Sequence, residues 1–346
     1  MQMQPTNIIQ FIFVFQMIFG VFLIWKNTRY RGLSYLLIFA ACSMVFNLLE
    51  ELSFTRDIYL ITPVFLLGKG PLVYLFVYQL IYPEKQISKA YVIHLSPMFV
   101  GVLFTQWPQL VIAVGSISQF IYAYFSIGLI LFYHKASLSM RSDADSLQLF
   151  WLIKVLLTFL VIGVLDLIRL NLQPYIGLNI NLVGQLFENT AVLLLFSYLI
   201  YKAVQHPLLF SGVSEYERIA LHTNQPIEQA NDELTMSIFQ SIDQLIRAKS
   251  LHHKPRLSLN DLAEETGLTT RDISQAMNQH AEGSFCDYVN KLRVGDLKQK
   301  LLEKPDANKS ILAMAFEVGF NSKSSLNLIF KRETSFTPSQ YMKNNQ

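Results

Sequence analysis

Cysteine and charge are both scarce in this chain of 346 residues. It has two cysteines, and Asp, Glu, Lys and Arg together make up 15% of its residues, against 52% hydrophobic residues. Cys42 and Cys286 are too far apart in sequence to support a disulfide framework or a cysteine-based metal site, so we expect both to be packing residues. So low a share of charge is atypical of a water-soluble protein.

The sequence signatures of several enzyme classes are also missing. The chain has no Gly-rich phosphate-binding loop, no His-Glu-x-x-His pair and no serine elbow motif. His94, His134 and His206 are too scattered to suggest a metal site. These absences predict a protein that is not an enzyme and that needs neither a cofactor nor a metal ion.

Hydrophobic residues gather in long runs within the first 202 residues. About 20 apolar residues are needed to cross roughly 30 Å of hydrocarbon. Seven runs come near this length, and the fourth is short. No small-residue cleavage site follows the first run, so we interpret it as a membrane helix rather than a removed signal peptide. The expected spans are 8–25, 33–49, 58–82, 91–106, 110–133, 149–170 and 178–201.

Lys and Arg are unevenly distributed over the loops that join these runs. Positive residues in short loops favour the cytoplasmic side of a membrane. One set of alternate loops carries eight of them, whereas the opposite set carries Arg56 and Arg169. This bias predicts an N-terminus outside and a C-terminus in the cytoplasm, and an odd number of spans agrees with it. The eight residues are Lys26, Arg29, Arg31, Lys85, Lys89, Lys135, Arg141 and Lys202.

Several ionisable residues lie inside the expected spans, where such residues usually face a bundle interior or a cavity. Lys69 and Glu188 lie deep in the third and seventh spans, and we expect them to face each other. Asp166 and Arg169 are spaced to pair along one helix face. Lys69, Asp166 and Glu188 are therefore candidates for an intramembrane sensing pocket open to the outside. The alternative is that they make structural contacts between packed helices. Other polar groups in the spans are Asn47, Gln185 and Asn189.

The composition changes after the last run. Residues 203–231 contain two prolines, a glycine and mixed polar residues, which predict a cytoplasmic linker. Apolar residues then recur at helical spacing and predict an amphipathic helix of about 231–250. It is either the first helix of a soluble domain spanning 232–346 or a dimerising helix, and we favour the first. Charge is denser here, since residues 254–346 carry thirteen Lys or Arg and eleven Asp or Glu.

A helix-turn-helix spacing is present in LSLNDLAEETGLTTRDISQAMNQH, at about 258–281. Gly267 stands at the turn, and we expect the second helix to begin near Thr270. Ser258 and Thr269 are each followed three residues later by Asp, which is the N-cap and N3 relation that begins a helix.

The same pattern recurs 52 residues later, with Ala315 and Gly319 in SILAMAFEVGFNSKSSLNLIFKRE. This repetition predicts a second helix-turn-helix unit at about 309–333. Apolar residues between the two units predict a helix of about 284–303, roughly 30 Å long at 1.5 Å per residue. That length is close to the ~34 Å of one DNA turn, so two recognition helices could enter successive major grooves.

These motifs resemble the AraC/XylS family of transcription regulators, whose DNA-binding domain has two helix-turn-helix units joined by a long helix. The resemblance covers about 232–343 and rests on GSFCDYVNKLRV, EVGFNSKSSLNLIFKRE and TPSQY. Less specifically, GPLVYLFVYQLIYP and KAVQHPLLFSG are similar to a bacterial subgroup with a seven-span N-terminal region. Together, these two resemblances imply an all-α protein, with a seven-helix transmembrane bundle at 1–202, the linker at 203–231 and an AraC-type domain at 232–346.

The family's pattern implies which residues meet DNA. Arg can hold guanine edges with two hydrogen bonds, and Gln and Asn can do the same with adenine. Phosphate contacts position a protein without specifying sequence. The base-reading candidates are Arg271, Ser274 and Gln275 on the first recognition helix, and Lys323, Ser324 and Asn327 on the second. The implied phosphate contacts are Lys331, Arg332 and Lys309.

Four positions deserve comparison with the family's pattern. Leu328 stands where many members have an Arg that meets DNA, Ser335 where Gly is common, and Leu297 where a small residue is usual. Gly295, inside the connecting helix, should cost about 1 kcal/mol relative to Ala. None of them removes a core position, so we expect the fold to form. Because Leu328 replaces an Arg that meets DNA, we expect DNA readout by the second unit to be weaker.

The sequence therefore predicts a membrane-anchored, sequence-specific DNA-binding transcription regulator of the bacterial cytoplasmic membrane. Its expected partners are double-stranded DNA, the lipid bilayer, a small-molecule or protein signal at the membrane region, and a second copy of the chain in a homodimer. A transporter or channel-like protein with an attached regulatory domain is the alternative. Lys69, Asp166 and Glu188 could serve a proton or solute path, although no inverted repeat is visible.

Overall fold

The protein is described here by a computed structural model, which contains helices and no strand among the residues that it describes. The prediction of an all-α fold is confirmed for them. Most of the predicted linker lies outside the described residues, as do Arg29, Arg56, Lys85, Lys89 and Arg141 of the loops. The described residues are 4–26, 30–52, 54, 60–82, 90–140, 142–143, 149–205, 232–303 and 309–345.

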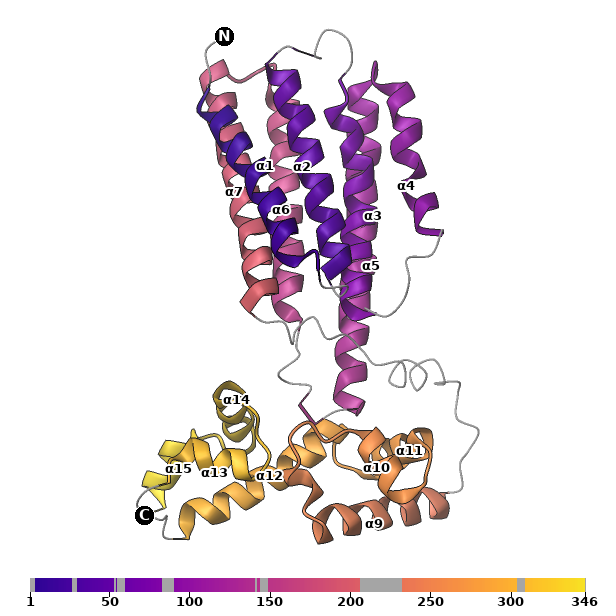
Figure 1. Ribbon diagram of the computed structural model, residues 1–346, viewed down its shortest axis with the longest axis vertical. Coiled ribbons are helices and arrows are strands. Elements are labelled where there is room, and N and C mark those ends of the chain that lie inside the picture. The colour runs from indigo at the N-terminus through magenta and orange to yellow at the C-terminus, as the bar shows by residue number, and fades with distance from the viewer. Residues whose placement is uncertain are drawn as a thin grey trace. The chain divides into compact units, whose positions relative to one another are not determined.

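The chain divides into two compact units. The first comprises Met1–Phe132 and Leu149–Val213, and the second comprises Tyr133–Gln148 and Ser214–Gln346. The apolar helices of the first unit run side by side as a bundle (Figure 1), with α1 packed on α2 and α7, and α3 packed on α2 and α4. Its helices are α1 (Pro5–Ile24), α2 (Arg31–Glu51), α3 (Thr62–Ile81), α4 (Ala90–Gly101), α5 (Pro108–Met140), α6 (Phe150–Leu172) and α7 (Leu178–Gln205); the end of α5, from Tyr133, is grouped with the second unit.

Six of these helices are long and apolar enough to cross a membrane. The fourth predicted span is different, because α4 has 12 residues and is followed by the short 3-10 helix η2 (Val102–Phe104). Twelve residues extend about 18 Å at 1.5 Å per residue, less than the roughly 30 Å of a hydrocarbon core. Six spans are thus supported by length and composition, whereas the seventh, and the odd number used to orient the chain, stay predictions.

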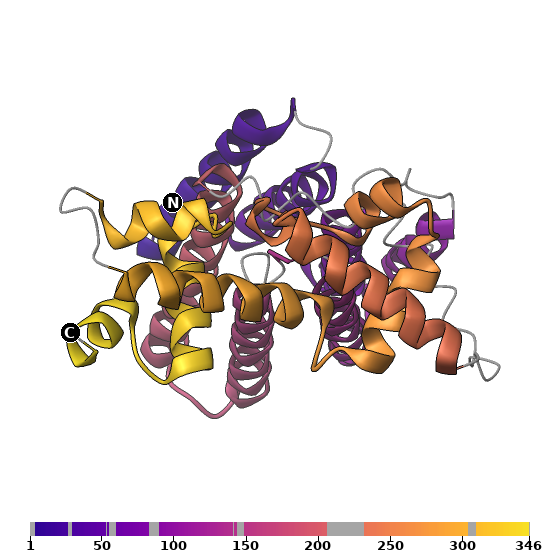
Figure 2. The ribbon, with the colours of Figure 1, turned by 90° about the horizontal axis from the view of Figure 1, so that it is seen from below.

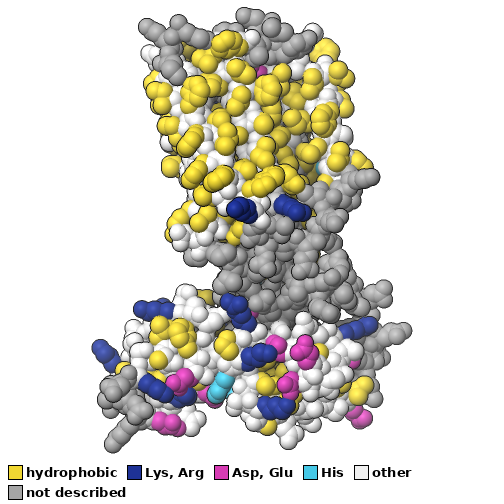
Figure 3. Space-filling model, viewed as in Figure 1, with side chains coloured by type: hydrophobic (Ala, Val, Ile, Leu, Met, Phe, Trp, Pro, Cys, Tyr) yellow, Lys and Arg dark blue, Asp and Glu magenta, His cyan; other side chains and the backbone are white. Residues whose placement is uncertain are grey.

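The outer surface of the first unit is apolar. Figure 3 shows hydrophobic side chains over most of the visible face of this unit. Many large apolar side chains are exposed on this surface, for example those of Phe22 at 79% and Leu103 at 78%. Exposing so many apolar side chains to water would be costly in free energy. Cys42 is also exposed, on α2, so the expectation that it packs inside is wrong, whereas Cys286 is buried as expected. Such a surface is suited to contact with lipid.

The second unit contains both predicted helix-turn-helix pairs. The second helix of the first pair begins at Thr270 as predicted, and the amphipathic helix predicted at about 231–250 is α9, which packs on α11 within this unit. The helices are α9 (Asp232–Ala248), α10 (Leu259–Thr266), α11 (Thr270–His280), α12 (Phe285–Leu302), α13 (Ile311–Glu317), α14 (Lys323–Thr334) and α15 (Pro338–Asn344), with the 3-10 helix η5 (Leu251–His253) after α9.

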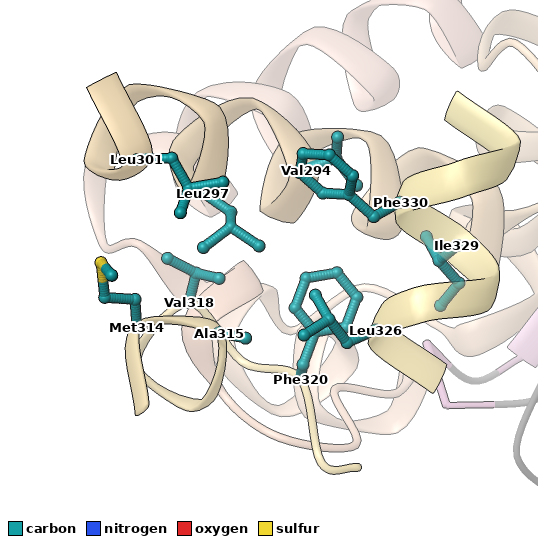
Figure 4. Close-up of a cluster of buried hydrophobic side chains, with 10 residues drawn as sticks. All are labelled: Val294, Leu297, Leu301, Met314, Ala315, Val318, Phe320, Leu326, Ile329 and Phe330. Carbon is teal, nitrogen blue, oxygen red and sulfur yellow. The ribbon is translucent and has the colours of Figure 1, made fainter. Parts of the chain in front are cut away.

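Two hydrophobic cores hold the second unit together, and α12 contributes to both. Phe285 and Val289 at its start pack with α9, α10 and α11, whereas Leu297 and Leu301 near its end pack with α13 and α14 (Figure 4). Because α12 contributes to both cores, it connects the two helix-turn-helix pairs (Figure 2). The second core consists of Val294, Leu297, Leu301, Met314, Ala315, Val318, Phe320, Leu326, Ile329 and Phe330.

Serine and threonine caps set where the helices of the second unit begin. Each helix from α10 to α15 follows a Ser or Thr whose side chain accepts a hydrogen bond from the backbone N–H three residues later. Each such cap is worth about 1 kcal/mol relative to Ala. Ser258 and Thr269 play this role for α10 and α11, as the sequence predicted. The caps therefore fix the start of both recognition helices, α11 and α14.

The left-handed backbone of Ser335 leads to a stability prediction. This residue ends α14 with φ +65°, a region that costs a residue with a Cβ about 1 kcal/mol more than Gly. We expect Ser335→Gly to raise the unfolding free energy of the second unit by about that amount. As a control, Ser339→Gly inside α15 should lower it, because Gly is unfavourable in a helix. Hydrogen exchange of the α14 and α15 amides measures both, and a loss of stability in Ser335→Gly would contradict the prediction.

Candidate DNA interface and membrane cavity

Helix α11 presents the first set of predicted base-reading residues. Arg271 is exposed, and Ser274 and Gln275 are partly exposed. Their i, i+3 and i+4 spacing puts them on one face of the helix. The buried residues Ile273 and Met277 occupy another face and pack in the first core. The helix is therefore anchored by one side and offers hydrogen-bonding groups on another.

Helix α14 repeats this arrangement in the second pair. Lys323, Ser324 and Asn327 are exposed, and Leu326 and Phe330 are buried in the second core. Lys331 is also exposed and follows Asn327 by four residues, which extends the exposed face by one turn. Arg332 on α14 is exposed too, so all eight predicted DNA-contacting residues on α11 and α14 have solvent-accessible positions.

Leu328 lies beside this face with 54% of its surface exposed. Arg is frequent at this position in the family that the sequence resembles. An exposed leucine offers no hydrogen bond to a base or phosphate, so α14 lacks one hydrogen-bonding group that the resemblance implies.

The cations predicted to contact phosphate differ in their surroundings. Lys309 Nζ lies 2.8 Å from a carboxylate oxygen of Glu317, which Lys300 also contacts at 2.7 Å. Hydrogen bonds from these two lysines lower the pKa of Glu317 to about 2, so at neutral pH its single negative charge is shared between them and offsets each only in part. Arg332 pairs with Asp287 at 2.9 Å. Lys331 makes no ion pair among the described residues, so of these three cations its charge is the most available to DNA.

The first unit encloses a cavity of about 350 Å³. Lys69, Asp166 and Glu188, which were predicted to form a sensing pocket, all line it, together with Arg169. The remaining wall is largely apolar, with side chains such as those of Phe13, Leu36, Phe39, Phe159 and Phe196. The structure therefore brings the predicted residues of α3, α6 and α7 together around one space.

Arg169 is the centre of the polar contacts in this cavity. Its Nε donates to Asp166 Oδ1 at 2.9 Å, and its Nη1 donates to Asn181 Oδ1 at 2.7 Å. The predicted pairing of Asp166 with Arg169 is therefore confirmed. Glu188 Oε2 lies 3.6 Å from Arg169 Nη2, so its ion pair is with Arg169. Lys69 Nζ lies 6.0 Å from the ring centroid of Phe159. The carboxyl group of Glu50 also lines the cavity.

Two glutamates at the end of α2 make contacts that sequence reasoning missed. Glu50 accepts hydrogen bonds from the backbone N–H groups of Ile61 and Thr62 at 2.6 and 2.8 Å and so caps the start of α3. Glu51 accepts from Gln10 at 2.8 Å and also from Gln185. Both glutamates lie just after the predicted span 33–49. Their partners come from other helices, so no spacing within one helix could have indicated them.

Comparison with known proteins adds one finding. Residues 262–344 match a family model described as a helix-turn-helix domain. The match runs from α10 to α15 and so includes both helix-turn-helix pairs and the connecting α12. The C-terminal region holds an AraC-type DNA-binding domain. An AraC-type domain suggests transcription regulation and points to a non-enzymatic protein. Neither the curated proteins nor the solved structures give a significant match to the chain.

Proposed function

We propose that this protein is a membrane-anchored transcription regulator, in which the helix bundle senses a signal and the AraC-type domain binds promoter DNA. One observation carries the proposal: a single chain combines six helices of membrane-spanning length with a helix-turn-helix match at 262–344. A DNA-binding domain that is tied to a bilayer can act only on DNA brought to that membrane, so the membrane part has a role in regulation beyond anchoring.

The AraC-type domain has the dimensions for bipartite DNA binding. Helix α12 has 18 residues and is about 27 Å long at 1.5 Å per residue. This is comparable to the ~34 Å between successive major grooves on one side of DNA. With one recognition helix packed near each end of α12, α11 and α14 can occupy neighbouring grooves. Base readout is assigned to Arg271, Ser274 and Gln275 on the first, and to Lys323, Ser324 and Asn327 on the second.

The topology we propose places the AraC-type domain in the cytoplasm. Lys26 follows the end of α1, and Lys202 lies in the last turn of α7. Positive residues at these ends favour the cytoplasmic side. The cavity is lined by Glu50, Thr62 and Pro108, which lie at the opposite ends of their helices and so face outside in this topology.

The signal we propose is a small amphipathic molecule that enters the cavity. A volume of about 350 Å³ falls in the size range of small-molecule sites, and such sites combine apolar walls with a few polar groups. Because Lys69 and Arg169 already lie near carboxylates in this cavity, a ligand without net charge disturbs these groups least. Polar atoms of the ligand would exchange for contacts within this group and so shift the packing of α3, α6 and α7.

Substitution of Lys69 tests the sensing role. We expect Lys69→Met to reduce induction of a target promoter at least ten-fold and to leave DNA affinity unchanged, since Lys69 lies in the membrane unit. Lys154→Met is the matched control, because Lys154 is exposed on α6 and does not line the cavity. The measurement is a reporter fused to a promoter found by genome-wide mapping, in cells grown under a panel of envelope stresses. If promoter induction in the Lys69→Met variant equals that of the parent under every inducing condition, the cavity has no sensing role.

Three measurements test the proposed function against that of a transporter with an attached domain. A reporter fused after Gln346 should give a cytoplasmic signal, and the full chain in lipid nanodiscs should retain specific promoter fragments. Reconstituted vesicles should show no flux of solute beyond that of empty vesicles. Flux without specific DNA retention would favour the transporter alternative and overturn the regulator.

A further inference from the structure

Two histidines and one carboxylate converge at the end of η5. His252 and His253 come from η5, and Asp296 comes from α12. The Nε2 atoms of the two rings lie 2.7 and 2.6 Å from the same oxygen, Asp296 Oδ2. One ligand atom from each of the three side chains lies within 4.8 Å of the others. No local sequence pattern indicates this group, because Asp296 lies more than forty residues after the histidines.

The backbone that carries the histidines is held firmly. Arg293, which is buried, donates from Nε to the carbonyl oxygen of His252 at 2.7 Å and from Nη2 to that of Lys254 at 2.9 Å. Gly319 also lies against this backbone, since a Cβ at that position would be 2.5 Å from the carbonyl oxygen of His252. Segments from η5, α12 and the turn between α13 and α14 therefore meet here, and the histidines are positioned before any ligand arrives.

We propose that His252, His253 and Asp296 form a binding site for a divalent transition-metal ion of the zinc type. Two imidazole nitrogens and one carboxylate oxygen are a ligand set that Zn²⁺ accepts, with water in its fourth position. The side chains of His253 and Asp296 are 33% and 40% exposed, so an ion and its water can reach the site from solvent. His252 is nearly buried, at 7%, and forms the inner wall.

The geometry needs only a small adjustment to admit the ion. Tetrahedral ligands about 2.0–2.1 Å from zinc lie roughly 3.3 Å apart, compared with 2.6 and 2.7 Å between the nitrogens and the oxygen here. The side chains must open by about 0.6 Å, and the two exposed ones are free to do so.

The expected affinity is moderate. Metal-bound histidines usually donate their second ring N–H to an acceptor, and loss of that acceptor costs about 10–100-fold in affinity. His252 Nδ1 is buried and has no hydrogen-bond partner within the described part of the chain. Zinc should therefore bind reversibly. By bridging η5 and α12 next to Gly319, it would stiffen the joint between the two helix-turn-helix pairs.

Cobalt titration of the full chain tests the site. The protein, purified in detergent with an affinity tag that contains no histidine and freed of metal with a chelator, is titrated with Co²⁺ and followed by visible absorption. We expect saturable binding of about one ion per chain, displaced by Zn²⁺, with affinity at least ten-fold lower in His253→Ala and in Asp296→Asn. His280→Asn is the matched control, because His280 also lies near a carboxylate, Asp232, at 3.7 Å, and it should bind like the parent.

Stability provides a second measurement that does not depend on the spectrum. Excess Zn²⁺ should slow hydrogen exchange in η5 and α12 of the parent and of His280→Asn, and should leave exchange in His253→Ala unchanged. This comparison of each variant with and without Zn²⁺ separates a lost metal site from a damaged fold. The proposal is overturned if the parent shows no saturable binding up to millimolar metal, or if His253→Ala and Asp296→Asn bind as tightly as His280→Asn.

Discussion

Replacing Gly319 with alanine should destabilise the second helix-turn-helix pair by several kcal/mol and abolish DNA binding. Gly319 has φ +98°, where a residue with a Cβ is strained. The added Cβ would also lie 2.5 Å from the carbonyl oxygen of His252 and 2.8 Å from Nε of Arg293. Both are held in place by their mutual hydrogen bond. Strain of about 1–2 kcal/mol and overpacking of about 1–3 kcal/mol together predict a loss of roughly 2–5 kcal/mol.

The same change at Gly295 should have the opposite sign. Gly295 lies inside α12, and a Cβ there would meet no atom within 4 Å. Alanine is favoured over glycine in a helix interior by about 1 kcal/mol, so Gly295→Ala should stabilise the second unit by that amount. Hydrogen exchange of the α12, α13 and α14 amides in the full chain measures both variants. If Gly319→Ala and Gly295→Ala shift protection in the same direction, the close packing assigned to Gly319 is wrong.

These two glycines also show what the sequence could and could not foretell. The spacing of Gly319 after Ala315 indicated a turn, and the apolar residues between the two units indicated the helix that contains Gly295, because both signals are local. The start of α11 followed from a local signal too, namely the cap Thr269. The contact between Gly319 and the backbone of η5 could not be foretold, because it joins segments more than sixty residues apart.

In the membrane unit, too, local sequence predicted some features and could not predict others. Charges within apolar runs must face inward, so Lys69, Asp166 and Glu188 were expected to share a space, and all three line one cavity. Which charge pairs with which depends on the rotation and tilt of each helix, and Glu188 pairs with Arg169 instead of Lys69. Likewise, the apolar run at 91–106 predicted a membrane span. The helix α4 ends at Gly101, however, and is too short by itself to span a bilayer.

DNA affinity should respond differently to two neighbouring positions on α14. Asn327 can bind an adenine edge, so Asn327→Ala should cost about 1–3 kcal/mol, roughly 5- to 150-fold in affinity, at promoter sites that carry this base. On duplexes without it the loss should be small. Lys331 is assigned to phosphate, so Lys331→Ala should weaken binding to all duplexes alike and reduce the slope of log affinity against log salt by about 0.9.

Lys309→Ala is the control that makes this comparison decisive. Lys309 is a surface lysine of the same unit, but its charge is already partly offset by Glu317 at 2.8 Å, a carboxylate that it shares with Lys300. Its removal should therefore change the salt slope much less than removal of Lys331, whose charge has no partner among the described residues. Binding of the full chain in nanodiscs to specific and scrambled duplexes at several salt concentrations gives all three slopes. Equal slopes for the two lysine variants, or a loss in Asn327→Ala that is the same on every duplex, would mean that α14 does not enter the major groove with this face. Readout would then rest on α11, the recognition helix that carries Arg271 and Gln275.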